Sequence, residues 1–486
     1  MTRRDVWQEV ERLLGTDPEY GDPAAIERRL LARLRVGLTM LADLGPRTSG
    51  AVRRCAASSD ADLRVMSRDP VLRNAFESDL RAVTAQPDAD PLLPALLPAD
   101  GGYAVSRAAG AAGGPAWRSP GSAWVWTEVG RRGGDPVAER LWFLLGEQFP
   151  DRSATVPIEP SAAELTVIEE AADLLTALMP AVGPGVLANI GMVGLARDEG
   201  ADGPLHSVAG GDRFPSTVFI APEKLRNVWD AAGALLHEGL HLTLFEIIRC
   251  GAVVPDHVDP TSDVVPIPWR REAWSLMRVL FALHVYVHLA VYHGLARSAG
   301  AGIRRRFGEP PADAALSRAT FGGARYATPE LRARHLAEQL ARRSQLFTAY
   351  GNELVAWLVR ALGLLAPAAP GDRAGTTFQA VAPVAAVPLP EQRRLVVALA
   401  DPPRVRWLNP SAWLAYSLCD GRDGAAIRTE YAESVAGAVP PAEALRQADA
   451  ALLALVDDGM VVARHEEPRA SLRTPSRPTG HDTEER

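Results

Sequence analysis

Cysteine is scarce in this sequence of 486 residues, which contains only Cys55, Cys250 and Cys419. An odd number of widely separated cysteines argues against a disulfide framework and against a cysteine zinc site. Lysine is scarcer still, because Lys224 is the only one and arginine supplies nearly all positive side chains. The net charge of −7 is too small in magnitude to indicate a nucleic-acid partner.

The sequence also lacks a clear membrane-targeting segment. Residues 1–9 do not form the apolar core of a signal peptide. The longest apolar stretch, residues 276–292, contains Arg278 and histidines, so we expect a buried helix rather than a membrane span. We therefore expect a cytoplasmic protein. Hydrophobic residues make up 47% of the chain and charged residues 23%, which allows a large core.

The most informative feature that is present is the sequence H-E-G-L-H, formed by His237, Glu238 and His241 with two residues between. It lies in the apolar run 231–246, which is rich in helix-forming alanine and leucine. Residues four apart share one face of a helix, so the two imidazoles can bind one metal ion. Glu238 would lie beside them, placed to move a proton on a metal-bound water or to hold that water.

The residues before the motif favour a zincin-like arrangement. Residues 216–221 are rich in β-branched side chains and predict a strand, and Pro222 and Glu223 predict the start of the following helix. In zincin-type sites an edge strand of the sheet can hold an extended peptide by main-chain pairing. The alternative is that the two histidines only line a helix face. A polar trio would then be costly to bury in so apolar a helix.

Two histidines leave a metal under-coordinated, so a third ligand is expected from a neighbouring helix. The apolar segment 272–293 contains His284 and His288, which are four apart and share a face. We favour His284 as the third ligand, then His288, then Glu272. Each of these histidines can instead be an ordinary core residue.

Hydrophobic periodicity and turn residues predict the rest of the organisation. Glycine-rich turns are expected at 183–212, and a polar loop at 251–268. We divide the chain into a helical N-terminal region (1–200), a catalytic core (201–366), a linker (367–379), a C-terminal domain (380–465) and a disordered tail (466–486). Helices are predicted at 1–85 in several pieces, 136–148, 161–180 (capped by Ser161 with Glu164 three residues on), 271–296, 329–345 and 347–365. In the C-terminal domain, strands are predicted at 392–400, 404–408 and 460–463, and helices at 409–420, 424–435 and 441–458.

The C-terminal domain carries a recognisable pattern. L-N-P-S-A-W-L-A-Y-S-L-C-D-G at 408–421 and A-L-L-A-L-V-D-D-G-M-V-V at 451–462 resemble a PqqD-like domain. Such winged-helix modules recognise the leader peptides of ribosomally made, post-translationally modified peptides. The resemblance implies a three-stranded sheet and a helix that bind the leader as an additional strand. The alternative is a generic small α+β domain.

A second resemblance covers about residues 200–370. The motif 237–241, with P-I-P-W-R-R-E-A-W at 266–274 and L-H-V-Y at 283–286, is similar to the HExxH proteins of such gene clusters. That family is described as α-ketoglutarate-dependent peptide β-hydroxylases. The resemblance implies that His237, His241 and His284 bind Fe(II), with Glu238 orienting a ligand or water.

The same resemblance implies a site for α-ketoglutarate. Arg270 is the candidate to hold a carboxylate of this cosubstrate, because guanidinium and carboxylate form a bidentate pair. The sequence departs from the family where Trp274 and Ser275 replace an expected Arg-Pro pair. Arg271 or Arg278 could compensate.

Together these features predict a mainly α (α+β) fold, with a helical zincin-like metal core, a small edge sheet and a C-terminal winged-helix domain. The expected function is Fe(II)/α-ketoglutarate-dependent hydroxylation of the β-carbon of a side chain in a ribosomally made precursor peptide. One alternative is a zinc metallopeptidase in which Glu238 is the general base. Another is a non-catalytic protein that binds the leader peptide.

Overall fold

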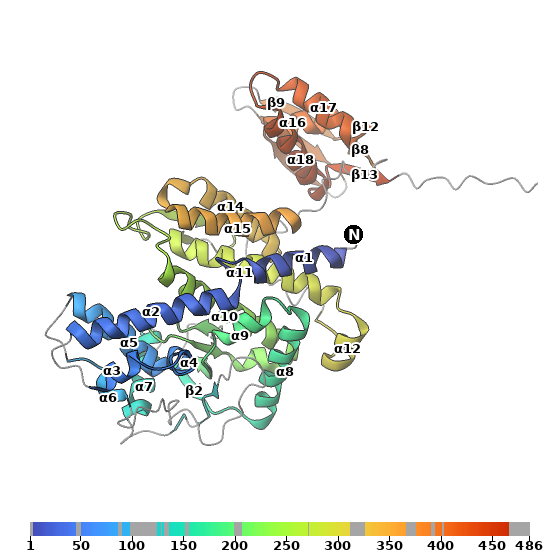
Figure 1. The fold of residues 1–486 in the computed structure, drawn as a ribbon. Coiled ribbons are helices and arrows are strands. Elements are labelled where there is room, and N and C mark those ends of the chain that lie inside the picture. Colours follow the sequence, from blue (N-terminus) through green and yellow to red (C-terminus); the bar gives the residue numbers. More distant parts are fainter. Residues whose placement is uncertain are drawn as a thin grey trace, which may run out of the picture. The chain divides into compact units, whose positions relative to one another are not determined.

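The structure is a computed structural model that divides into two compact units, Met1–Leu365 and Ala366–Arg486, which we describe separately (Figure 1). The predicted linker begins beside this division. Most of the linker, the predicted tail and Arg271 lie outside the described residues. The structure describes residues 3–44, 50–85, 90–97, 124–127, 129–130, 136–150, 155–198, 207–270, 272–311, 326–365, 376–389, 394–400 and 403–465.

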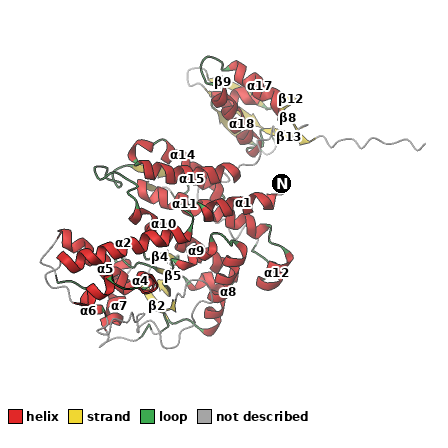
Figure 2. Ribbon diagram, viewed as in Figure 1, coloured by secondary structure: helices red, strands yellow, loops and turns green. Residues whose placement is uncertain are grey.

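The first unit is mainly helical (Figure 2). Trp7 and Leu14, near the N-terminus, share one hydrophobic core with residues as distant as Leu365. The predicted border at residue 200 therefore lies inside one packed unit. The helices are α1 (Arg3–Thr16), α2 (Pro23–Leu44), α3 (Gly50–Ala56), α4 (Asp60–Arg68), α5 (Pro70–Ala85), α6 (Leu93–Leu96), α7 (Pro136–Gln148), α8 (Ala162–Leu178), α9 (Gly183–Ala188), α10 (Val228–Cys250), α11 (Leu276–Arg297), α12 (Ala301–Phe307), α14 (Pro329–Ala341) and α15 (Ala349–Leu365).

Helix α10 carries the H-E-G-L-H motif, as predicted, but it begins later than the sequence indicated. Pro222–Arg226 forms a separate short 3-10 helix, η2. The backbone of Asn227 is extended and separates η2 from α10. The side chain of Asn227 accepts a hydrogen bond of 2.7 Å from the main-chain N–H of Asp230 and so caps α10. The apolar positions Leu236, Leu240 and Leu244 are buried in the core.

Helix α11 also begins later than predicted, because residues 272–275 form a strand. Strands β6 (Val264–Ile267) and β7 (Glu272–Ser275) pair in antiparallel fashion inside the segment expected to be a loop and a helix start. Ser275 then caps α11. Helix α11 is long and apolar enough to cross a membrane, yet 72% of its apolar window is buried within the protein. It is a core helix, which is consistent with a soluble protein.

Helices α10 and α11 run antiparallel. The hydroxyl of Tyr292 donates to the main-chain oxygen of Trp229 at 2.8 Å, near the start of α10. At the other end, the rings of Phe245 and Phe281 have centroids 4.6 Å apart. The middle of α11 therefore lies against the turn of α10 that carries the motif.

A five-stranded sheet packs against α10 in the first unit. Its strand order is β1-β3-β5-β4, and β2 pairs with β3. Strand β5 is the predicted strand before the motif, but it lies inside the sheet, parallel to β3 and antiparallel to the edge strand β4. Strand β3 occupies part of the segment expected to be glycine-rich turns. The strands are β1 (Trp124–Val125), β2 (Thr155–Ile158), β3 (Met192–Asp198), β4 (Val208–Ala209) and β5 (Thr217–Ile220).

A buried network of charges joins the N-terminal helices to α10. Arg73 is fully buried, and it donates to Glu77 at 2.9 Å and to Glu246 of α10 at 3.0 Å. Arg33 donates two hydrogen bonds to Glu77, and Arg249 donates one to Glu246 at 2.6 Å. These pairs compensate charges that would otherwise be costly inside the protein.

The network makes the stability of the first unit depend on pH. Burial alone would raise the pKa of Glu77, but the hydrogen bonds from Arg33 and the charges of Arg73 and Arg249 lower it to about 2. The ordinary pKa of this carboxyl is 4.5. The pKa of Glu77 is therefore lower in the folded protein than in the unfolded one. The stabilisation that its carboxylate gives to the fold is complete above about pH 4.5 and is lost as the pH falls toward about 2.

The described part of the second unit forms two small antiparallel sheets and three helices. The sheets have the strand orders β11-β10-β9 and β12-β8-β13. Strands β10, β11 and β13 and the helices α16, α17 and α18 were predicted from the sequence, whereas β8, β9 and β12 were not. The elements are β8 (Thr376–Ala380), β9 (Ala385–Leu389), β10 (Arg394–Leu399), β11 (Arg404–Leu408), α16 (Pro410–Leu418), β12 (Asp420–Asp423), α17 (Gly424–Ser434), α18 (Pro441–Asp457) and β13 (Val461–His465).

We expect Arg73→Ala to lower the free energy of unfolding of the first unit by about 3–5 kcal/mol, because it leaves buried carboxylates uncompensated. The control is Arg306→Ala, which removes a pair with Asp173 in which the arginine side chain is 60% exposed. That change should cost no more than about 1 kcal/mol. Urea unfolding followed by circular dichroism measures both, and equal effects would contradict the role given to the network.

Candidate metal centre

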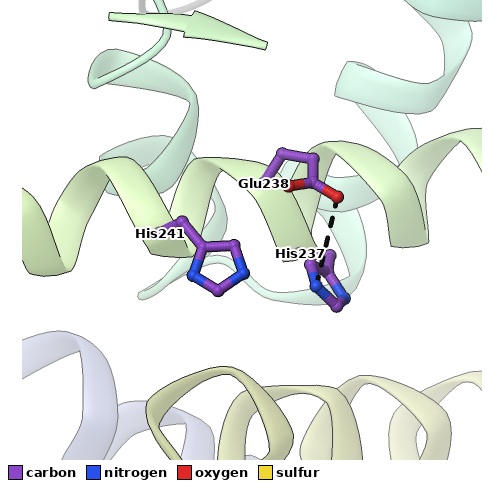
Figure 3. Close-up of side chains that lie close together, drawn as sticks. All are labelled: His237, Glu238 and His241. Atoms are coloured by element: carbon purple, nitrogen blue, oxygen red, sulfur yellow. Dashed lines mark ion pairs between the residues drawn. The ribbon is translucent and has the colours of Figure 1, made fainter. Parts of the chain in front are cut away.

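The three polar residues of the motif form one compact group on α10. The possible ligand atoms of His237, Glu238 and His241 all lie within 4.8 Å of one another. The imidazole centroids are 5.1 Å apart, and Nε2 of His237 is 4.0 Å from Oε1 of Glu238. Figure 3 shows both imidazoles on the same side of the helix, with the Glu238 carboxylate directed toward His237. The predicted shared face of His237 and His241 is therefore present.

This group lies at an open cavity of about 640 Å³. The side chain of His237 is 37% exposed toward this space, whereas Glu238 is almost fully buried. The edge strand β4 contributes Val208 and Ala209 to the wall, and α11 contributes Phe281, whose ring centroid is 5.7 Å from that of His241. The remaining lining residues are Gln148, Ser207, Gly210, Gly211, Asp212, Arg213, Phe245 and Arg278.

The surroundings keep both imidazoles neutral. Burial among protein atoms lowers the pKa of His237 to about 4, and the charges of Lys224 and Arg270 contribute. Burial and the neighbouring His237 lower the pKa of His241 to about 3. Neutral imidazole has a free lone pair, which is the form that binds a metal. Two such donors one helical turn apart, with a carboxylate beside them, fit a divalent transition metal.

Glu238 connects the motif to the edge of the sheet. Its carboxyl accepts a hydrogen bond from the main-chain N–H of Ala209 in β4. Burial raises its pKa well above the ordinary value, although this hydrogen bond and the charge of Lys224 oppose the shift. The hydrogen bond fixes the carboxyl group between the motif and the strand that lines the cavity.

The structure does not bring His284 or His288 into the motif group. Their rings are buried with centroids 4.6 Å apart, and Nδ1 of His288 donates to the main-chain oxygen of His284 at 2.8 Å. Both rings lie about 6 Å from the ring of Trp357. They line a small cavity of about 20 Å³ that shares no lining residue with the larger one. Burial, His288 and the nearby His241 hold the pKa of His284 well below its usual value.

Glu272, the third candidate ligand, is on strand β7 rather than on a helix. Its carboxylate accepts hydrogen bonds from Trp274 at 2.6 Å and from Arg278 at 3.4 Å. It is not part of the motif group. The sequence predicted a helix from residue 271 and therefore put Glu272 on a helix. The pairing of β6 with β7 overrides this local helical preference.

The candidate cosubstrate arginines differ in their positions. Arg278 lines the cavity, but it pairs with Glu272 and its guanidinium lies 4.6 Å from the centroid of the Trp274 ring. Arg270 is exposed, and its charge reaches His237. Sequence reasoning missed Lys224 as a site residue, although its uniqueness in the chain and its place just before α10 are visible in the sequence.

A comparison of the sequence with models of known protein families gives no match, and neither does a comparison with curated proteins. The resemblances described above therefore stay predictions. The metal centre is supported by the geometry of its own residues.

We expect His241→Ala to abolish stoichiometric metal binding, because it removes one of the two imidazole donors. His284→Ala should retain the metal and reduce stability, since its ring lies in the separate small cavity. The exposed His257 provides a surface control, His257→Ala. Metal content after reconstitution with Fe(II) or Zn(II), measured by elemental analysis, distinguishes these cases. Loss of the metal in His284→Ala would instead show that His284 is a metal ligand.

Proposed function

We propose that this protein is a peptide hydroxylase that uses Fe(II) and α-ketoglutarate to oxidise a side chain of a ribosomally made precursor peptide. The observation that carries the proposal is the pair of neutral imidazoles on one face of α10, open to a cavity of about 640 Å³. Imidazole donors suit iron, and a site of few protein ligands leaves positions for other molecules.

His237 and His241 would hold the iron. When bound, iron would supply the activation of dioxygen and the oxidation of an unactivated C–H bond. The protein residues around it have distinct roles. Phe245 and Phe281 give the cavity an apolar wall that limits water, and Glu238 holds a proton or orients a bound water beside His237. Arg270, whose charge acts on His237, would attract an anionic cosubstrate.

The position of the edge strand β4 supports the proposal that the substrate is a peptide. Ser207–Gly210 line the same cavity as the motif, and among the described strands β4 pairs only with β5. The outward main-chain groups of Ala209 now bond to Glu238 and, at 3.3 Å, to Gln148, so an extended peptide would add here by exchanging these bonds for its own, and this would bring its side chains to the metal centre. An arrangement with a metal helix and an antiparallel edge strand also supports the zincin-like description of the core.

The second unit supports recognition of a leader peptide. Its antiparallel sheet β9-β10-β11 is followed by the helices α16, α17 and α18, which fits the order expected of a PqqD-like winged-helix domain. Strand β11 is an edge strand, and Val405 and Trp407 on it are 56% and 58% exposed. A leader segment could extend this sheet and cover both side chains. Among the described residues, the one helix apolar enough to span a membrane is α11 of the first unit, and it is mostly buried. A cytoplasmic location fits the proposed role.

A zinc metallopeptidase is the second candidate. The position of Glu238, with Oε1 4.0 Å from Nε2 of His237, and the edge strand at the cavity would serve peptide hydrolysis equally well. In that reaction Glu238 would be the general base for a water that attacks a peptide carbonyl.

The test uses the full chain and candidate precursor peptides sought among the short reading frames that neighbour its gene. With Fe(II), α-ketoglutarate and air, we expect a mass gain of one oxygen atom in the peptide, and none with His241→Ala. Cleavage of the peptide with zinc and no keto acid would instead identify a peptidase. Peptide binding without either product would show that the chain is a non-catalytic peptide-binding protein.

We expect Trp407→Ser to weaken leader binding at least about tenfold, because it removes an exposed aromatic anchor from the binding edge. Val387→Ser is the matched control, since Val387 is 52% exposed on β9 at the opposite edge of the same sheet. Fluorescence anisotropy of a labelled leader peptide measures both affinities. A larger loss with Val387→Ser would place the leader on the β9 edge.

A further inference from the structure

One residue of the edge strand β4 presents its main chain to the cavity. Ala209 lies opposite Val218 in the β4–β5 pair. The next residue, Gly210, donates its N–H to the main-chain oxygen of Thr217 at 2.8 Å. Successive residues of an antiparallel pair alternate between facing the partner strand and facing away from it, so the N–H and the carbonyl of Ala209 point away from β5. This carbonyl accepts a hydrogen bond of 3.3 Å from Nε2 of Gln148.

Gln148 has a fixed backbone and a weakly held side chain. It is the last residue of α7, and the next residue, Phe149, is buried with its ring centroid 5.5 Å from that of Phe219. Arg213 donates to the main-chain oxygen of Glu147 at 2.8 Å, which ties the end of α7 to the turn that follows β4. The side-chain bond of Gln148, at 3.3 Å, is long for an N–H···O hydrogen bond. The amide can therefore exchange its partner for another while the helix stays in place.

Polar groups at this wall of the cavity have unused hydrogen-bonding capacity. Gln148 and Ser207, the residue directly before β4, both line the cavity. Among the residues that the structure describes, Oε1 of Gln148 accepts no hydrogen bond, and the buried hydroxyl of Ser207 has no partner. A buried polar group without a partner lowers the stability of a protein, and a ligand that supplies the partner removes this cost. An extended main chain that lies along β4 would meet both groups.

We infer that Gln148 binds the main chain of the peptide substrate on the side opposite β4. In the free protein its amide occupies the carbonyl of Ala209, and in the complex a main-chain N–H of the peptide takes that carbonyl. The amide then turns to the outward groups of the peptide, since a side-chain amide offers both donors and an acceptor to a peptide unit. This inference rests on the proposed peptide substrate and adds a requirement. The N–H that pairs with Ala209 must be free, so neither proline nor an N-methylated residue can supply it.

The full chain loaded with Zn(II) allows a test that needs no precursor peptide. The probe is a hydroxamate joined through a succinyl group to trialanine amide, so that the hydroxamate binds the metal and a plain main chain lies along β4. Acetohydroxamate is the control for the metal-binding group alone. We expect Gln148→Met, which keeps the length of the side chain and removes the amide, to weaken binding of the peptide probe about three- to tenfold, as the loss of one neutral hydrogen bond does. Binding of acetohydroxamate should not change. Isothermal titration calorimetry measures both affinities.

Methylated probes and a neighbouring residue provide the controls. Each amide nitrogen of the probe is methylated in turn, and one of these changes should weaken binding at least about fivefold, because that N–H pairs with Ala209. Glu147→Met is the matched substitution, since Glu147 is the exposed neighbour of Gln148 on α7 and is not among the residues that line the cavity. We expect it to leave the affinity of every probe unchanged.

The outcomes separate this inference from the proposed function. If a precursor peptide gains oxygen but Gln148→Met binds the peptide probe as tightly as the unchanged protein, the inference is wrong and the proposed function stands. Tighter binding by Gln148→Met would also overturn it, because the amide would then only cover the strand edge. An equal loss with Glu147→Met, or a peptide probe that binds no more tightly than acetohydroxamate, would overturn it as well. If acetohydroxamate does not bind at all, the metal centre is wrong, and the proposed function fails together with this inference.

Discussion

The structure depends on one constraint, which is that α10 must be buried on most of its surface while one strip faces an open cavity. Leu236, Leu240 and Leu244 bind the helix to the core, and His237 and His241 occupy the strip between α11 and the edge strand. The geometry of the imidazole pair is therefore fixed by packing that has nothing to do with metal. A rigid helix holds donor atoms more accurately than a loop can, and a preformed pair loses little entropy when it binds an ion.

Electrostatics divides the region around α10 into two parts. On one part, the network of Arg73, Glu77 and Glu246 compensates buried charge and joins the N-terminal helices to the end of α10. On the other, the charges of Lys224 and Arg270 act on His237 and lower its pKa. The first arrangement stabilises the fold, since each charge is paired. The second helps to keep the imidazole of His237 neutral, which is the form that binds a metal.

The sequence predicted local elements well. The apolar spacing around the motif indicated α10, Ser161 with Glu164 indicated the capping box of α8, and the residues at 136–148 indicated α7. It failed where strand pairing, rather than local composition, decides the structure. Strand β3 has glycine-rich neighbours, and β7 begins a segment of helical composition, so only their partners β5 and β6 make them strands. The same limit applies to β8, β9 and β12 of the second unit.

By itself the sequence determined that His237 and His241 share a helix face, because a separation of four residues fixes that in any α-helix. It could not determine what stands opposite them. His284 and His288 have the same spacing on α11, yet the rotation of that helix places them at a different cavity beside Trp357. The rotation follows from the packing of the whole apolar surface of α11, not from any single residue. Likewise, only the packing of η2 and of the turn after β6 brings Lys224 and Arg270 to one imidazole.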